Sequence, residues 1–183
     1  MVIEMKLLFC GRRGAGKSTI IRRLLPPGVS LYGFETFFAS GGNGASALYI
    51  RRPYDLQTPC GPQNRVGTRG AAPGTAVCFP RVFDAYGTSL IQNIPAGSIV
   101  VMDELGYLER EAHVFLRQVF EILTGPYHIL AAVRNTHLPH WQKINMLPGI
   151  KTLQITAENR EELYCSIRSW PQYTDIFSNQ KIF

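Results

Sequence analysis

Short apolar runs alternate with segments of helical periodicity along most of the chain. The apolar runs are bounded by glycine, proline or charged residues, and they predict buried strands at 6–10, 30–36, 99–102, 128–133 and 150–155. In the intervening segments apolar positions recur every three or four residues, which predicts helices at 17–25, 81–93, 110–123 and 157–169. Thr156 is the expected N-cap of the last helix. Strands that alternate with helices indicate an α/β fold with a largely parallel sheet.

One segment departs from this pattern. Between residues 39 and 75 glycine and proline recur, and only residues 47–50 favour a strand. We expect a glycine-rich hairpin with long loops, inserted into the main domain rather than forming a second one. The whole chain, residues 1–183, is accordingly predicted to be a single domain.

The first candidate chemistry comes directly after the first predicted strand. Residues 11–19 read GRRGAGKST and match the phosphate-binding pattern G-x-x-x-x-G-K-[ST], in its required place between a strand and a helix. Glycines let successive backbone N–H groups form one concavity, and the helix adds its positive N-terminal end. Lys17 would reach the β- and γ-phosphates, and the Ser18 hydroxyl would bind Mg²⁺. The predicted nucleotide-binding residues are Gly11, Arg12, Arg13, Gly14, Ala15, Gly16, Lys17, Ser18 and Thr19.

A pair of acidic residues follows the strand at 99–102. A carboxylate at the end of an apolar strand is what a P-loop protein needs to hold the Mg²⁺ shell, so Asp103 joins Ser18 as a predicted metal residue. Glu104 is placed to accept a proton from an attacking water. The alternative is that both acids cap the next helix or lie in solvent.

The strand at 128–133 ends in Arg134-Asn135-Thr136. Nucleotidases that carry a glutamate after the magnesium aspartate often place an additional strand between the P-loop strand and the aspartate strand, and this one is the candidate. Numbering the five predicted strands along the chain, the expected sheet order is 5-1-4-3-2. Arg134 would then stabilise the transferring phosphoryl group, although a loop that caps the next short helix explains it equally well. The predicted catalytic residues are Glu104, Lys17 and Arg134.

With both motifs in place, the chain resembles the small cancer-related and thermophile-type nucleoside-triphosphatase family. The resemblance rests on five stretches in the family's order and spacing, GRRGAGKST (11–19), GFET (33–36), VVMDELGYLE (100–109), AAVRN (131–135) and LPGIKTLQITAENREEL (147–163). It implies a RecA-like P-loop domain, a three-layer sandwich that slowly hydrolyses ATP, GTP and other nucleotides with Mg²⁺. By position it gives the phosphate, magnesium and base roles to the residues already named.

The same resemblance leaves some positions without a role. Asn159 and Arg160 match a late Asn-Arg pair, and Arg160 would either reach the nucleotide or pack at the start of a helix. Leu105 and Tyr107 depart from the family's usual residues. Phe37-Phe38 stand where acidic and basic residues are common, and residues 39–75 match poorly.

Charge and composition limit the kinds of binding partner that we expect. The net charge is +6, and Arg12, Arg13, Lys17, Arg22 and Arg23 concentrate part of it at the phosphate loop, where it would attract a triphosphate. Nucleic acid binding stays an alternative that no motif supports. The longest apolar runs are too short to span a bilayer, and four scattered cysteines fit reduced thiols, so we expect a cytoplasmic protein without a membrane partner. The oligomeric state is open, with a monomer as one expectation.

Two other functions compete with hydrolysis. The first is a nucleotide or small-molecule kinase, in which Arg51, Arg52, Arg65 and Arg69 would form a lid over the phosphates. The second is a nucleotide-controlled binding module that turns over negligibly and changes partner affinity with the γ-phosphate. A strand at 99–102 directly beside the strand at 6–10 would favour the kinase.

Overall fold

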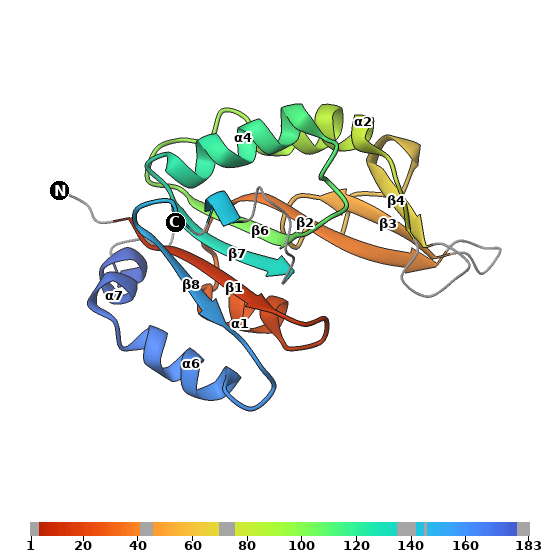
Figure 1. Cartoon of the computed structure of the whole chain (residues 1–183). Helices are drawn as coiled ribbons and strands as arrows, with labels where there is room; N and C mark the ends of the chain where they lie inside the picture. Colours follow the sequence, from red (N-terminus) through yellow and green to blue (C-terminus); the bar gives the residue numbers. More distant parts are fainter. Residues whose placement is uncertain (1–3, 41–45, 70–75, 135–141, 145, 179–183) are drawn as a thin grey trace.

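The structure is a computed structural model that describes residues 4–40, 46–69, 76–134, 142–144 and 146–178. One sheet runs through it, and its strands in the described residues follow the order β5-β4-β3-β2-β6-β7-β1-β8 (Figure 1). The strands are β1 (Lys6–Gly11), β2 (Leu31–Ser40), β3 (Ser46–Arg51), β4 (Arg65–Arg69), β5 (Ala76–Cys78), β6 (Ile99–Leu105), β7 (His128–Arg134) and β8 (Ile150–Gln154).

The parallel part of the sheet has the predicted order. Strands β2, β6, β7, β1 and β8 are mutually parallel neighbours, which is the order 5-1-4-3-2 counted along the chain. β7 therefore lies between the P-loop strand β1 and the acidic strand β6. This arrangement confirms the predicted α/β fold and is not the one that would have favoured a kinase.

The region at 39–75 differs from the expected hairpin with long loops. Beyond β2 the sheet continues with β3, β4 and β5, each antiparallel to its neighbour. The apolar pattern that predicts strands is weak in β4 and β5. Charged residues and glycine dominate β4, which reads RVGTR, and β5 has only three residues, too few to show a pattern. Pairing with β3 and burial of Val66 nevertheless hold β4 in the sheet. We refer to β3, β4 and β5 as the antiparallel wing.

Each face of the sheet carries its own apolar core. Along β6, Val100 and Met102 face one core, whereas Ile99 and Val101 face the other, because successive strand residues point to opposite faces. The first core is covered by α4 (His113–Thr124) with the short segments α2 (Pro80–Val82), η2 (Phe83–Gly87) and α3 (Thr88–Leu90). The second is covered by α1 (Lys17–Leu24), α6 (Arg160–Arg168) and α7 (Pro171–Ser178). Figure 1 shows the resulting three layers.

Three predicted helices have different boundaries, and the one expected at 110–123 begins at His113. The helix expected at 81–93 is replaced by the short segments α2, η2 and α3, with one π-helical turn that ends at Gly87. A Cβ at Gly87 would lie 3.1 Å from the Phe115 ring, so glycine lets the segment pack closely on α4. The last predicted helix begins at Arg160, and Thr156 instead exchanges hydrogen bonds with Asn159 in the preceding turn. No helix in the described residues is long and apolar enough to cross a membrane.

Candidate active site

The predicted site residues meet at one edge of the sheet. Parallel strands end at the same edge, and the register aligns Gly11 at the end of β1 with Arg134 at the end of β7. Asp103 and Glu104 lie at the end of β6, next to β7. The structure brings these segments together around a cavity of about 680 Å³.

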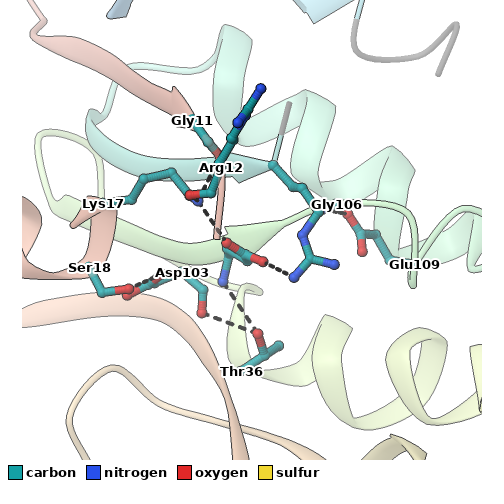
Figure 2. A network of polar contacts seen from close by, with 10 residues as sticks. Gly11, Arg12, Lys17, Ser18, Thr36, Asp103, Gly106 and Glu109 are labelled. Carbon is teal, nitrogen blue, oxygen red and sulfur yellow. Dashed lines mark hydrogen bonds and ion pairs between the residues drawn. The ribbon is translucent and has the colours of Figure 1, made fainter. Parts of the chain in front are cut away.

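The P-loop folds around the Lys17 side chain. Gly14 and Gly16 have φ angles of 81° and 99°, a left-handed conformation that side chains other than glycine rarely adopt. The buried Lys17 Nζ donates hydrogen bonds to the carbonyl oxygens of Gly11 (2.9 Å) and Arg12 (3.1 Å) (Figure 2). Two carbonyls and the start of α1 thus fix the position of the ammonium group.

Ser18 and Asp103 form the candidate metal pair. The Ser18 hydroxyl donates a hydrogen bond of 2.9 Å to Asp103 Oδ1. Burial raises the pKa of Asp103 to about 6, and the hydrogen bond from Ser18 opposes that rise. A hydroxyl and a carboxylate beside a phosphate loop supply oxygen donors, which Mg²⁺ prefers because it is a hard cation. Two protein ligands are enough, since this ion keeps several of its waters. No cluster of three or more His, Cys, Asp or Glu that could hold a metal occurs in the described residues.

Glu104 lies between two cations. Its carboxylate is 3.3 Å from Lys17 Nζ and 2.7 Å from Arg134 Nη2. The backbone N–H of Glu104 donates to the Thr36 hydroxyl (3.3 Å), which in turn donates to the Asp103 carbonyl (3.4 Å). The Asp103–Glu104 peptide bond is cis. Thr36 therefore joins β2 to the acidic pair. Thr36 is the last residue of the GFET stretch, but the sequence alone does not reveal this contact.

Glu109 is a buried acid that the site prediction missed. It is only 2% exposed and accepts a hydrogen bond of 2.5 Å from the Gly106 N–H, as Figure 2 shows. Burial raises the pKa of Glu109 to about 7; the Gly106 hydrogen bond and Arg134 act against the rise, and Glu104 adds to it. In the sequence, Glu109 stands out only as the last residue of the VVMDELGYLE stretch.

The late Asn-Arg pair has two separate tasks. The Asn159 side chain accepts from the Thr156 N–H and donates to the Gln154 carbonyl, so it closes the turn before α6. Arg160 packs on the P-loop, where a Cβ at Gly16 would lie 2.5 Å from its Cδ. Arg160 also lines the cavity.

The remaining predicted residues divide into two groups. Arg12, Arg13, Gly14, Gly16 and Thr19 line the cavity, whereas Ala15 packs beside Gly11. Asn135 and Thr136 lie outside the described residues.

Only one arginine of the expected kinase lid reaches the cavity, as far as the described residues show. Arg51 pairs with Glu35 (2.7 Å), and Arg65 stacks on Phe79. Arg52 is exposed and is not part of the cavity wall, which leaves Arg69.

Comparison with known proteins identifies the family. A sequence model described as NTPase matches residues 6–168. The chain belongs to this NTPase family. The resemblance inferred from the motifs is thereby confirmed, and the protein is an enzyme that hydrolyses nucleoside triphosphates.

Individual relatives agree with this assignment. The nucleoside-triphosphatase THEP1 of Methanothermobacter thermautotrophicus is 29% identical over an alignment that covers 89% of this chain and 94% of that protein. The crystal structure of THEP1 from the hyperthermophile Aquifex aeolicus superposes with a TM-score of 0.62 and 17% identity, over 89% of this chain and 96% of that one. At this identity the second likeness shows the fold alone.

Proposed function

We propose that this NTPase hydrolyses nucleoside 5′-triphosphates, ATP and GTP among them, to the diphosphate and inorganic phosphate in a Mg²⁺-dependent reaction. The observation that carries the proposal is the position of the Glu104 carboxylate. It lies 3.3 Å from the P-loop Lys17 and 2.7 Å from Arg134, directly after the Asp103 that Ser18 contacts. A base, two phosphate-directed cations and a metal pair thus share one cavity.

Each residue takes one part of the reaction. Lys17 and the P-loop N–H groups bind the β- and γ-phosphates. Ser18 and Asp103 would hold Mg²⁺, which when bound neutralises phosphate charge. Glu104 orients a water molecule and accepts its proton while the water oxygen bonds to the γ-phosphorus and the bond to the β–γ bridging oxygen breaks. Arg134 stabilises the charge on the transferring phosphoryl group.

Substrate range and location belong to the same proposal. The curated relative is named a nucleoside-triphosphatase without a base, which supports a broad substrate range. All four cysteines are free thiols, which supports work in the reducing cytoplasm.

Replacement of Glu104 by glutamine tests the proposed base. The substitution keeps the size of the side chain and removes the basic oxygen, so phosphate release should fall by about 10²–10⁴-fold. The affinity for ATP and Mg²⁺ should stay the same or rise, because Lys17 and Arg134 lose a competing carboxylate. Asp103→Asn is the contrasting variant, and it should lose magnesium dependence together with turnover.

The exposed Glu121 of α4 offers a matched control. Glu121→Gln should hydrolyse ATP at the wild-type rate. If Glu104→Gln also releases phosphate at that rate, Glu104 is not the base and the mechanism is wrong.

A further inference from the structure

The cavity extends well beyond the residues that would hold a triphosphate. Lys17, Asp103 and Glu104 line one part of it, whereas the other part is lined from β2 and the antiparallel wing. β4 is three strands away from β6, and neighbouring strands are ~4.8 Å apart, so this part reaches about 14 Å past the acidic pair. We call it the outer compartment, and its lining is Phe38, Leu48, Thr68, Arg69, Ala76 and Phe83.

The triphosphate does not need the outer compartment. This step rests on the proposed function, in which Glu104 faces the γ-phosphate. The nucleoside is attached to the α-phosphate, so it lies at the end of the phosphate chain away from Glu104. The outer compartment lies beyond Glu104 from the nucleoside, so it offers room for a second molecule.

Two arginines give the outer compartment a positive charge. The guanidinium carbons of Arg13 and Arg69 lie 5.4 Å and 5.6 Å from the centre of the Phe38 ring, and that ring belongs to a residue that is 45% exposed. Within the described residues neither arginine has a carboxylate partner. The segments 41–45 and 70–75, which follow β2 and β4 in the sequence, contain no Asp or Glu. Lys17 and Arg134, in contrast, are both paired with Glu104.

Cation–π contact leaves much of a guanidinium group's donor capacity unused. The attraction is between the positive charge and the ring face, so the N–H edges stay free for an anion. Planar N–H donors suit phosphate and carboxylate groups, which they bind by paired hydrogen bonds. Arg13 comes from the P-loop and Arg69 from β4, so an anion held by both would sit where the two parts of the cavity meet.

The rest of the compartment is apolar. Leu48, Ala76 and Phe83 contribute apolar side chains to it, and Tyr107 and Leu108 of the turn after β6 line the same cavity. Apolar walls with a few convergent polar groups are typical of sites for small organic molecules. The two guanidinium groups lie over the Phe38 ring, and the edge of such a ring packs favourably against the face of another flat ring.

We propose that the outer compartment binds a second small molecule, an organic anion that carries a flat ring. Its phosphate or carboxylate binds Arg13 and Arg69, and its ring packs on Phe38 and the apolar wall. The site is distinct from the triphosphate site and is occupied together with it.

Titration calorimetry on the nucleotide-loaded protein tests this proposal. The protein is saturated with Mg²⁺ and the β,γ-imido analogue of ATP, which occupies the P-loop without turnover. It is then titrated with AMP and with 2-naphthoate, which combine a ring with a phosphate or a carboxylate. Adenosine supplies a ring alone and inorganic phosphate an anion alone. At least one ring-bearing anion should bind with one-to-one stoichiometry, about tenfold or more tightly than adenosine or phosphate.

Variants of the outer compartment locate the bound anion. Arg69→Ala and Phe38→Leu should each weaken the ring-bearing anion by about tenfold or more, while the affinity for the ATP analogue changes less than about twofold. Arg117→Ala, which removes an exposed arginine from α4, is the matched control and should change neither affinity.

Three results would overturn the proposal. In the first, neither ring-bearing anion binds the loaded protein. In the second, one of them binds Arg69→Ala and Phe38→Leu as tightly as it binds the wild-type protein. In the third, binding is seen only without the ATP analogue, and the analogue competes with it. If the analogue itself fails to bind, the proposed function fails instead. Titration of the protein without analogue then still tests Arg69 and Phe38.

Discussion

Replacement of the buried Glu109 by glutamine should change how stability depends on pH. Burial raises the pKa of Glu109 from 4.5 to about 7 in the folded protein. Between these two pH values the folded chain keeps a proton that the unfolded chain has lost. The folded state then binds more protons, so the free energy of unfolding falls as pH rises through this window. The penalty is absent below pH 4.5 and complete above about pH 7.

The size of the effect follows from the same rise in pKa. One pKa unit corresponds to about 1.4 kcal/mol, so the rise of Glu109 destabilises the folded protein by about 3 kcal/mol at neutral pH. The amide that replaces the carboxyl in the Glu109→Gln variant does not ionise, and its carbonyl oxygen still accepts from the Gly106 N–H. The stability of Glu109→Gln relative to wild type should therefore rise by about 3 kcal/mol from the acidic to the neutral end of this window.

Urea denaturation at several pH values, followed by tryptophan fluorescence, measures this difference. Asp103 titrates in the same direction, with its pKa raised from 3.8 to about 6, but it is present in both proteins and cancels in the comparison. Glu121→Gln, at an exposed position of α4, controls for the loss of one carboxylate. A difference between Glu109→Gln and wild type that stays constant with pH would refute the reasoning, because Glu109 would then ionise as it does in the unfolded chain.

Three further substitutions, the last with a matched control, test the phosphate loop, the second cation and the sheet. Lys17→Ala should weaken binding of the ATP analogue by at least about 100-fold, measured by calorimetry, and should lower the melting temperature because the buried ammonium joins two carbonyls of the loop. Arg134→Ala should lower phosphate release at saturating ATP by about 10²–10³-fold; wild-type turnover would remove it from the mechanism. Gly33→Ala should cost at least about 3 kcal/mol in urea denaturation, because φ is 106° and a Cβ would lie 1.9 Å from the Val101 carbonyl oxygen. Gly97→Ala, with φ of 77° and no atom within 4 Å, should cost only about 1–2 kcal/mol, and equal losses in both variants would contradict the clash.

The parallel half of the fold was predictable because its signals are local. Strands buried on both faces are continuous apolar runs, and β1, β6 and β7 are all of this kind. The P-loop and the acidic pair come directly after two of these runs, so the chemistry could be assigned to one edge of the sheet. The glycine of the GFET stretch can be read from the sequence, but the reason for it is a tertiary contact. β2 approaches Val101 so closely that no side chain fits at Gly33.

What the sequence did not reveal depends on contacts between distant segments. The π-helical turn within the segment 81–93 ends at Gly87, which packs closely on Phe115, 28 residues later in the chain. Glu109 looks like a surface acid in the sequence, and only the packing of the turn after β6 buries it. The sequence does not distinguish Arg69 from the other arginines of the wing; what sets Arg69 apart is that β4 ends at the cavity.

In the proposed mechanism, the ion pairs of Glu104 link substrate binding to catalysis. The carboxylate holds both Lys17 and Arg134, the two cations that a triphosphate would also use. A phosphate that binds these cations must compete with Glu104 for them, and the displaced carboxylate then lies beside the γ-phosphate, where an attacking water needs a base. The negative charge that would let Glu104 act as the base would therefore also lower the affinity for the substrate. This opposition is why Glu104→Gln should separate the two effects, with slower turnover and equal or tighter binding in the same variant.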